Sequence, residues 1–330
     1  MPHTLTRRAF LALTAVAVGG ALGVAGATGV ISRAPMTDQT VPVGELTLVV
    51  QADPWRMILS APNGDIVWQE PLDQTLSFRT PEGQIYRARR MASCSGVGSG
   101  GVQMTAETDD PLGGAIALEV QQVGPRAFRM RVTADRQGPV AGLGGAFEAA
   151  ADERFVGFGE RFDSVNQRGR VLDVWAEDRR VANYGASTYA PLPLLLSSRG
   201  HSFALERFER SRFDLAASQA DRWSWQQDAP STSIVVGYGP SLKDLVRRNV
   251  ELTGLPPLPP AWTFGVWKTS VGGADAVIDE MRRLRAQNIP ISAVFSFDAV
   301  DSNANLGWPD VTFAGRRAGQ YPDPAAYTST

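Results

Sequence analysis

The sequence of 330 residues contains few of the side chains that most often bind metals or carry out nucleophilic chemistry. It has one cysteine, Cys94, and two histidines, His3 and His201. A single cysteine excludes an internal disulfide bond and a thiolate metal cluster, and we expect Cys94 to be a small buried apolar side chain. Two histidines are too few for a His-rich zinc site. No partner base is identifiable for His201, which we expect to be a turn or strand residue.

The chain also lacks an excess of positive charge. It has 32 Lys and Arg residues against 34 Asp and Glu residues, which gives a formal net charge of −2. Binding to nucleic acid or to an anionic membrane surface depends on clustered positive charge. The composition therefore provides no electrostatic argument for either partner.

The first 27 residues have the pattern of an export signal. Arg7 and Arg8 precede an apolar run, and Ala25 and Ala27 form an A-x-A cleavage site, which predicts a twin-arginine signal and a location outside the cytoplasmic membrane. The alternative is an uncleaved anchor, although the run is barely long enough to span a bilayer. Cleavage would change the formal charge from −2 (32 basic, 34 acidic) to −4 (30 basic, 34 acidic).

A linker over residues 28–40 is predicted to lead into a β-rich domain over residues 41–240. Segments such as "LTLVVQ", "AIALEVQQV" and "FRMRVTA" alternate apolar and polar side chains and are separated by Gly, Pro, Asn and Asp. This alternation is typical of strands with one buried face, and many strands about ten residues apart favour a β-sandwich.

A helix and a proline-rich linker are predicted over residues 241–260. Ser241 and Asp244 form a capping box, the apolar residues of "LKDLVRRNVEL" have helical spacing, and Gly254 is placed to end the helix. The prolines of "LPPLPP" cannot join a helix or the interior of a sheet, so a domain boundary is predicted there.

Residues 261–330 begin with a predicted βαβ unit. "WTFGVWKTS" is expected to be a buried strand, "ADAVIDEMRRLRAQN" an amphipathic helix and "IPISAVFSFD" a second strand; this succession implies a parallel sheet. In barrels built from such units, residues just past the C-terminal ends of the strands form the active site. The predicted strands place Trp267 with Lys268, and Asp298 with Asp301, at these positions.

Three residues are candidates for contact with a sugar, and each has a structural alternative. Asp178 ends "VWAED", where a carboxylate near a tryptophan is suited to sugar hydroxyls. Trp267 could stack on a pyranose ring or fill a core, and Asp298 could bind hydroxyls or cap a loop. Glu160 in "GFGER" is expected to accept backbone hydrogen bonds or to pair with an arginine.

Together these motifs resemble glycoside hydrolase family 31, which contains retaining α-glucosidases, α-xylosidases and sulfoquinovosidases. The resemblance runs from about residue 150 to residue 330, with a weaker sandwich-like match before it. Its six motifs, in order along the chain, are "FVGFGERFDSVNQRG", "VWAED", "YAPLPLLLSSRGHSFALE", "LTGLPPLPPAWTFGVWKTS", "RAQNIPISAVFSFDAVD" and "QYPDP". Each motif is unspecific alone, but six in the family's order are highly specific.

The resemblance implies a mostly β protein. Residues from about 40 to 240 would form a galactose-mutarotase-like β-sandwich, and residues from about 258 the start of a (β/α)8 barrel. It implies that Asp178 touches the sugar or leaving group from a sandwich loop. It also implies that Trp267 lines the sugar pocket and that Asp298 holds hydroxyls of the glycone. Ser292 and Lys268-Thr269 depart from the family pattern.

The resemblance also implies a substrate and a reaction, namely hydrolysis of α-linked glycosides with retention and without a metal or organic cofactor. Retaining enzymes use two carboxyl groups about 5 Å apart, which in this family follow the fourth and sixth barrel strands. About 70 residues follow Ala261, whereas a closed barrel takes about 250. We therefore expect the 330-residue chain to end before its catalytic acids and to be inactive alone.

The sequence leaves two alternatives to an α-glycosidase. The first is a carbohydrate-binding or scaffold protein derived from the same family. The second, aldose epimerisation by the sandwich, uses a histidine acid with a carboxylate base. It is disfavoured because His201 is the one histidine that remains after the signal.

Overall fold

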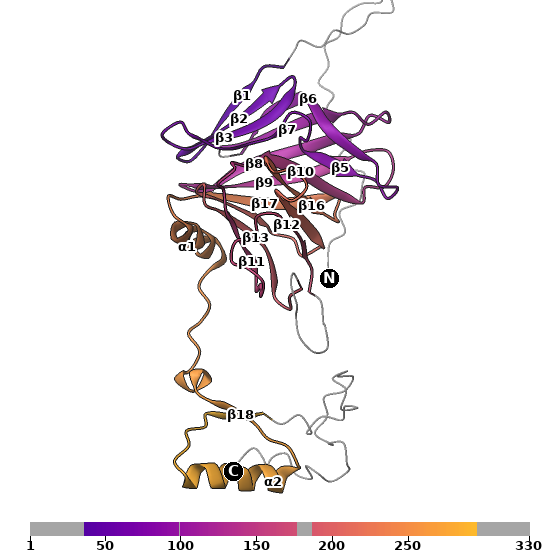
Figure 1. Ribbon diagram of the computed structural model, residues 1–330. Helices are drawn as coiled ribbons and strands as arrows, with labels where there is room; N and C mark the ends of the chain where they lie inside the picture. Colours follow the sequence, from indigo (N-terminus) through magenta and orange to yellow (C-terminus); the bar gives the residue numbers. More distant parts are fainter. Residues whose placement is uncertain (1–35, 99, 177–186, 296–330) are drawn as a thin grey trace, which may run out of the picture. The chain divides into compact units, whose positions relative to one another are not determined.

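The computed structural model describes residues 36–98, 100–176 and 187–295. These residues form a β-sandwich, a helix that packs on it, and a βαβ segment further along the chain (Figure 1). The signal predicted for residues 1–27, Asp178 and Asp298 lie outside the described residues.

A small antiparallel sheet forms the first part of the sandwich. Its strands alternate buried and partly exposed side chains, as the sequence predicts, so that each presents one apolar face. The sheet has the order β1-β2-β3-β4, with β1 at Gln39–Val43, β2 at Leu46–Ala52, β3 at Trp55–Ser60 and β4 at Ile66–Gln69.

The remaining strands of the sandwich form one antiparallel sheet of thirteen strands in the order β11-β13-β14-β17-β9-β8-β7-β6-β5-β10-β16-β15-β12. They are β5 Ser77–Arg79, β6 Ile85–Val97, β7 Gly101–Thr108, β8 Ala115–Gly124, β9 Ala127–Asp135, β10 Gly142–Glu148, β11 Phe155–Gly159, β12 Arg170–Val174, β13 Pro191–Ser197, β14 His201–Leu205, β15 Ser211–Leu215, β16 Arg222–Gln227 and β17 Ser231–Tyr238.

The long strand β6 connects the two halves of this sheet. Its first residues pair with β5 and the remainder pairs with β7, with register shifts between Ala88 and Arg90 and between Met91 and Ser93. Such irregularities bend a strand. The halves are joined by aromatic contacts: Phe203 of β14 lies 5.9 Å from Phe147 of β10, 5.3 Å from Trp223 and 5.6 Å from Trp225 of β16, measured between ring centroids.

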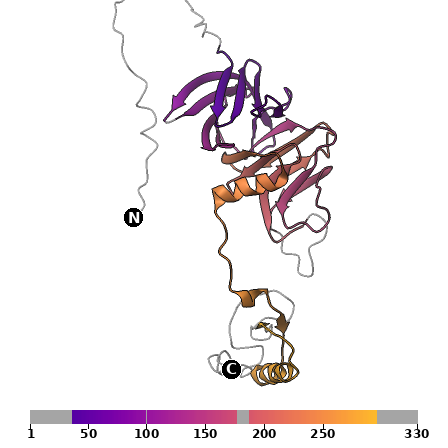
Figure 2. The same ribbon diagram turned by 90° about the vertical axis from the view of Figure 1, so that its left-hand side faces the viewer.

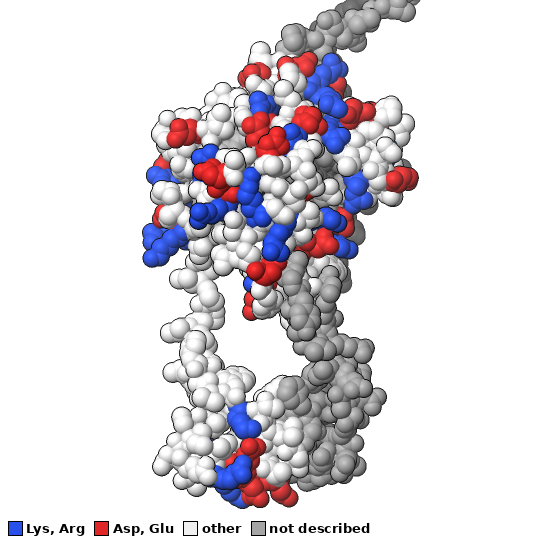
Figure 3. Space-filling view, in the orientation of Figure 1, with Lys and Arg blue, Asp and Glu red and all other residues white. Residues whose placement is uncertain are grey.

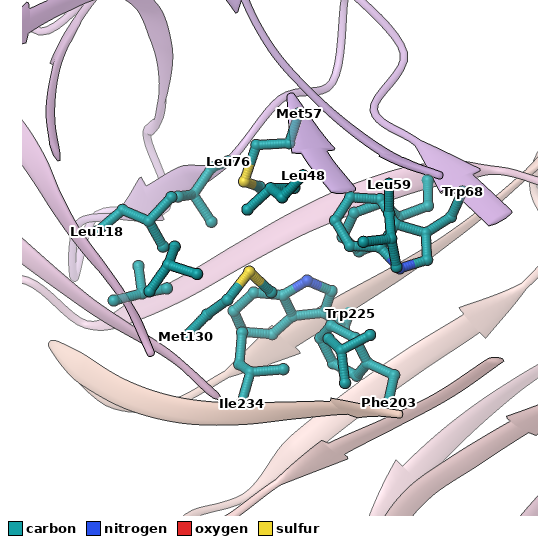
Figure 4. Close-up of a cluster of buried hydrophobic side chains, with 14 of the residues drawn as sticks. Leu48, Met57, Leu59, Trp68, Leu76, Leu118, Met130, Phe203, Trp225 and Ile234 are labelled. Atoms are coloured by element: carbon teal, nitrogen blue, oxygen red, sulfur yellow. The ribbon is translucent and has the colours of Figure 1, made fainter. Parts of the chain in front are cut away.

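The small sheet adds its apolar face to the same core. Figure 4 shows Leu48, Met57 and Leu59 in one cluster with Met130 of β9 and Trp225 of β16. All five side chains are buried. The predicted sandwich is thus confirmed, and its strands run from Gln39 to Tyr238.

Helix α1, Leu242–Thr253, packs on β17 and β13 of the sandwich (Figure 2). Ser241 caps it by accepting a hydrogen bond from the Asp244 backbone N–H at 3.2 Å, and Leu245 is its buried anchor. Gly254, with φ of 83°, ends the helix and donates to the Val250 carbonyl. These observations confirm the predicted start and end of the helix.

The βαβ segment contains the 3₁₀ helix η1 at Ala261–Phe264, the strand β18 at Trp267–Thr269, the helix α2 at Ala274–Ala286 and the strand β19 at Ala293–Phe295. The parallel pairing of Trp267 with Ala293 confirms the predicted βαβ order. The prediction of one buried strand over "WTFGVWKTS" is wrong. After Pro260 the chain turns in η1, so the strand is short, and Trp262, Phe264 and Trp267 remain exposed.

Among the described residues, no helix has the length and apolar character needed to cross a bilayer. Figure 3 shows acidic and basic side chains interspersed over the visible face of the sandwich.

Candidate functional site

The "GFGER" segment forms an irregular end to strand β11. Its pairing with β13 shifts register between Gly157 and Gly159, and three successive residues have positive φ: 109° at Gly157, 66° at Phe158 and 79° at Gly159. Side chains are rarely tolerated in this region of φ, and a Cβ at Gly159 would lie 2.0 Å from the Ala190 carbonyl oxygen. Phe158 has a positive φ although it carries a side chain. Its ring is fully buried, and the ring centroid lies 5.1 Å from that of Phe213.

Arg161 lies just beyond this irregularity and has a structural role. Its guanidinium donates to the backbone carbonyls of Phe158 and Asp173, both at 3.2 Å. Burial lowers the pKa of Arg161, although the nearby carboxylates of Asp163 and Asp173 oppose the shift. The arginine therefore connects the end of β11 with the end of β12.

Glu160 does not have its predicted role. Its backbone N–H donates to the Ala190 carbonyl at 3.1 Å, but the side chain is exposed, and within the described ranges no group donates to its carboxylate. The reversed backbone of the preceding residues turns the side chain to solvent.

A hollow of about 240 Å³ lies where β12, β13 and the β14–β15 turn meet. Trp175, Phe208, Pro191 and Pro193 line it, and Arg207 and Glu209 form an ion pair at its rim. Trp175 is 49% exposed and Phe208 is 85% exposed. Exposed aromatic faces beside hydrogen-bonding groups are suited to ligands that are apolar on one side and polar on the other.

The tryptophan of "VWAED" is visible in the sequence as a candidate, whereas Phe208 was not predicted. The available signal was one apolar residue among charged neighbours in "ERFERSR", in a turn between two alternating segments. An apolar side chain in a charged turn does not pack in the core, so it is exposed unless a ligand or partner covers it.

Trp267 is the one predicted sugar-binding residue inside the described ranges. The expectation that it follows the first barrel strand is wrong, because η1 delays that strand and Trp267 is its first residue. The indole is 55% exposed, donates its N–H to the Thr263 carbonyl at 3.1 Å and stacks on Trp262 with centroids 6.0 Å apart. Lys268 beside it forms an ion pair with Glu280 at 3.2 Å.

His201 is the first residue of β14, as predicted, but it is also fully buried and has an acidic neighbour. Its Nε2 lies 4.0 Å from Oε1 of buried Glu153, and its ring stacks on Trp223. Burial lowers the pKa of His201 to about 3 and raises the pKa of Glu153. Glu153 was not identifiable from the sequence as a partner of His201, because the two residues are 48 positions apart.

Cys94 is half-buried rather than buried, because the end of β6 that carries it extends into an exposed hairpin. Burial raises the pKa of its thiol, which disfavours a reactive thiolate. Within the described part of the chain, no three His, Cys, Asp or Glu side chains gather as a metal site requires.

The two sheets form a β-sandwich domain that carries an exposed aromatic hollow. Residues 33–214 match the glycosyl hydrolase 31 N-terminal galactose mutarotase-like domain. The chain therefore belongs to glycoside hydrolase family 31, as its motifs indicate.

Similar proteins include an α-xylosidase, XylQ, from Lactiplantibacillus pentosus. It is 32% identical over 151 residues, covering 44% of this chain and 19% of that protein. An isomaltosyltransferase from Sporosarcina globispora is 28% identical over 187 residues, covering 54% of this chain and 17% of that protein. The chain thus spans about a fifth of the length of these relatives.

Solved structures share the fold. A family 31 sulfoquinovosidase from E. rectale superposes with a TM-score of 0.53 at 13% identity, over 80% of this chain and 41% of that chain. A cycloalternan-forming enzyme from Listeria monocytogenes superposes with a TM-score of 0.51 at 17% identity, over 88% of this chain and 30% of that chain.

Proposed function

We propose that this chain is the N-terminal part of a secreted α-glycosidase that hydrolyses α-linked glycosides of the glucoside or xyloside type with retention. The observation that carries the proposal is the family match over residues 33–214. The relatives named α-xylosidase and isomaltosyltransferase support an α-linked substrate.

Three residues would contact the sugar in this proposal. Asp178 follows exposed Trp175 by three positions and would bind a hydroxyl or the leaving group. Trp267, whose indole is fixed by Thr263 and by stacking on Trp262, would line the glycone pocket. Asp298 would hold hydroxyls of the glycone.

Retention requires a carboxylate nucleophile and a carboxylic acid about 5 Å apart on either side of the scissile bond. We expect these acids on later strands of a (β/α)8 barrel, to which β18 and β19 contribute the first parallel pair. The hollow beside Trp175 would then hold sugar units of a longer substrate.

The test compares the 330-residue chain with a protein extended by any codons that continue the reading frame after Thr330. The extended protein should hydrolyse an aryl α-glucoside or α-xyloside with retention, followed by NMR of the released anomer. The shorter chain should show no turnover. Hydrolysis by the 330-residue chain would overturn the placement of the acids, and an inactive, folded extended protein would overturn the enzymatic function.

A carbohydrate-binding or scaffold role is the second candidate, and the exposed hollow beside Trp175 favours it. In that case α-linked oligosaccharides would bind to the 330-residue chain in calorimetric titrations, and the extended protein would bind them without hydrolysis.

Export by the twin-arginine route is a further part of the proposal. Replacement of both Arg7 and Arg8 by Lys should retain the protein in the cytoplasm, whereas the unchanged chain should reach the extracytoplasmic fraction. Unchanged export of the double variant would contradict the twin-arginine assignment.

A further inference from the structure

A cleft of about 730 Å³ opens in the sandwich, about three times the volume of the hollow beside Trp175. Its walls come from strand β4 of the small sheet, the end of β10 with the segment that follows it, and the start of β16, together with Arg199 and Tyr238. None of its lining residues was a candidate in the sequence motifs.

One wall presents a carboxylate in a fixed orientation. Glu148 Oε1 accepts a hydrogen bond from Arg56 Nη2 at 2.8 Å, and Glu148 Oε2 accepts one from Gln69 Nε2 at 2.6 Å. Charge-assisted bonds to both oxygens hold the group in place. Each oxygen still has a lone pair to accept a hydrogen bond from a ligand.

Arg222, the register partner of Glu148 on the neighbouring strand β16, presents a guanidinium held in a similar way. Arg222 Nη1 donates to both oxygens of Asp73 at 2.9 and 3.0 Å, and Arg222 Nε donates to Asp221 Oδ1 at 3.1 Å. The side chains of Asp73, Asp221 and Glu148 are 68%, 74% and 45% exposed, and exposed ion pairs contribute little to stability. Stability therefore does not explain why these charged side chains are paired around one cleft.

The third part of the lining is buried. Glu153 is 2% exposed and lines the cleft. It accepts hydrogen bonds from Ser197 Oγ at 2.5 Å and from the Ala150 backbone N–H at 3.1 Å. Directly behind it His201 is 1% exposed, and within the described residues neither of its ring nitrogens has a hydrogen-bond partner. Buried polar groups are nearly always paired in folded proteins, so this corner has unused hydrogen-bonding capacity.

The charges of the lining side chains indicate which class of ligand the cleft can bind. Carboxylates outnumber guanidiniums, with Asp65, Glu148, Glu153 and Asp221 against Arg199 and Arg222, which disfavours an anion. The described residues place no three metal-binding side chains together, which gives no basis for a metal ion. An uncharged molecule with many hydroxyl groups can donate to the carboxylates and accept from Arg222 at the same time.

We propose that this cleft is a sugar-binding site, separate from the hollow beside Trp175, that takes a neutral mono- or disaccharide. Its position follows from the Glu148, Arg222 and Glu153 groups that converge on it. Only the choice of a sugar among polyhydroxylated ligands rests on the proposed function.

The test is calorimetric titration of the 330-residue chain with D-glucose, D-xylose and isomaltose. We expect a dissociation constant on the order of 1 mM for at least one of them. Glu148→Gln keeps the shape of the side chain but removes its charge, and it should weaken that binding about tenfold. Arg222→Lys, at the paired position on β16, should also weaken it.

Two matched variants serve as controls. Glu119→Gln removes a partly exposed glutamate of strand β8 that pairs with Arg131 at 3.0 Å, and it should leave binding unchanged. Leu112→Ala, at an exposed apolar residue between β7 and β8, should also leave binding unchanged, and circular dichroism should show that every variant is folded.

The outcomes separate this proposal from the proposed function. Absence of binding up to about 20 mM sugar, or binding that survives both Glu148→Gln and Arg222→Lys, would overturn the cleft assignment alone. Binding lost in Trp175→Ala but retained in Glu148→Gln would place the sugar in the other hollow. Glycoside hydrolysis by the extended protein with no sugar bound in the cleft would leave the proposed function standing.

Discussion

Nε2 of His201 lies 4.0 Å from Oε1 of Glu153, and the two side chains are only 1% and 3% exposed. Strand β14 supplies the histidine, while the acid lies in the loop between β10 and β11. The imidazole is kept neutral because its charged form would be buried. This burial makes His201 a source of pH-dependent stability.

The first prediction concerns acid unfolding. Burial lowers the pKa of His201 from 6.5 to about 3. Below pH 6.5 the unfolded chain therefore binds a proton at His201 that the folded chain does not bind. The contribution of His201 to stability is complete above pH 6.5 and is lost as the pH falls towards 3, by about 1.4 kcal/mol per pH unit. In urea titrations, the stability difference between the wild type and His201→Gln should shrink over that range. A difference that stays constant would contradict the assignment.

The second prediction has the opposite sign and concerns Glu70, a fully buried carboxyl group directly after β4. Burial raises its pKa from 4.5 to about 8, although hydrogen bonds from the Met57 and Leu76 backbone N–H groups oppose the shift. The folded chain therefore retains a proton that the unfolded chain releases above pH 4.5. Its contribution to stability is complete below pH 4.5 and is lost as the pH rises to about 8.

The measurement again compares the wild type with a variant. This is needed because the pH dependences of the His201 and Glu70 contributions to stability have opposite signs between pH 4.5 and 6.5. The stability of the wild type relative to Glu70→Gln should fall by about 1.4 kcal/mol per pH unit between pH 5 and 8. Glu119→Gln, on the exposed face of β8, should show no such slope. Parallel pH profiles for the wild type and Glu70→Gln would exclude a raised pKa.

The third prediction tests the irregular end of β11. Gly159→Ala combines a positive φ of 79° with a Cβ placed 2.0 Å from the Ala190 carbonyl oxygen, and we expect a loss of about 3 kcal/mol in unfolding free energy. Gly169→Ala has the same φ of 79° but no atom within 4 Å of its Cβ, so it should lose only about 1 kcal/mol. If Gly159→Ala and Gly169→Ala lowered the melting temperature equally, the contact between the new Cβ and the Ala190 carbonyl oxygen would contribute nothing to the loss of stability.

The fourth prediction concerns Trp175. Because its indole is half-exposed, Trp175→Ala should change the unfolding free energy by no more than about 0.5 kcal/mol. It should weaken binding of an α-linked oligosaccharide about tenfold, since truncation of an aromatic contact residue removes much of the binding energy. The titration is best made in the Glu148→Gln background, so that the second cleft does not contribute. Leu112→Ala, at an exposed apolar residue between β7 and β8, is the control and should have no effect on affinity.

Local chemistry made several elements predictable. Alternation of apolar and polar residues identified the strands, and the Ser241 cap and Gly254 set the ends of α1, because these signals depend on neighbours a few residues apart. Trp267 was placed wrongly, since no local signal showed that the chain would first turn in η1. Phe208 was missed because exposure depends on what the fold leaves uncovered.

The sequence by itself determined the mostly β character, the βαβ order, the family and the small number of cysteine and histidine residues that limits the chemistry. Only the tertiary structure placed Glu153 beside His201, and Glu148 and Arg222 in the walls of one cleft. Glu148 and Arg222 are 74 positions apart, and each looks like an ordinary surface charge in the sequence. Antiparallel pairing of β10 with β16 brings them together, and such long-range pairing leaves no periodic signal along the chain.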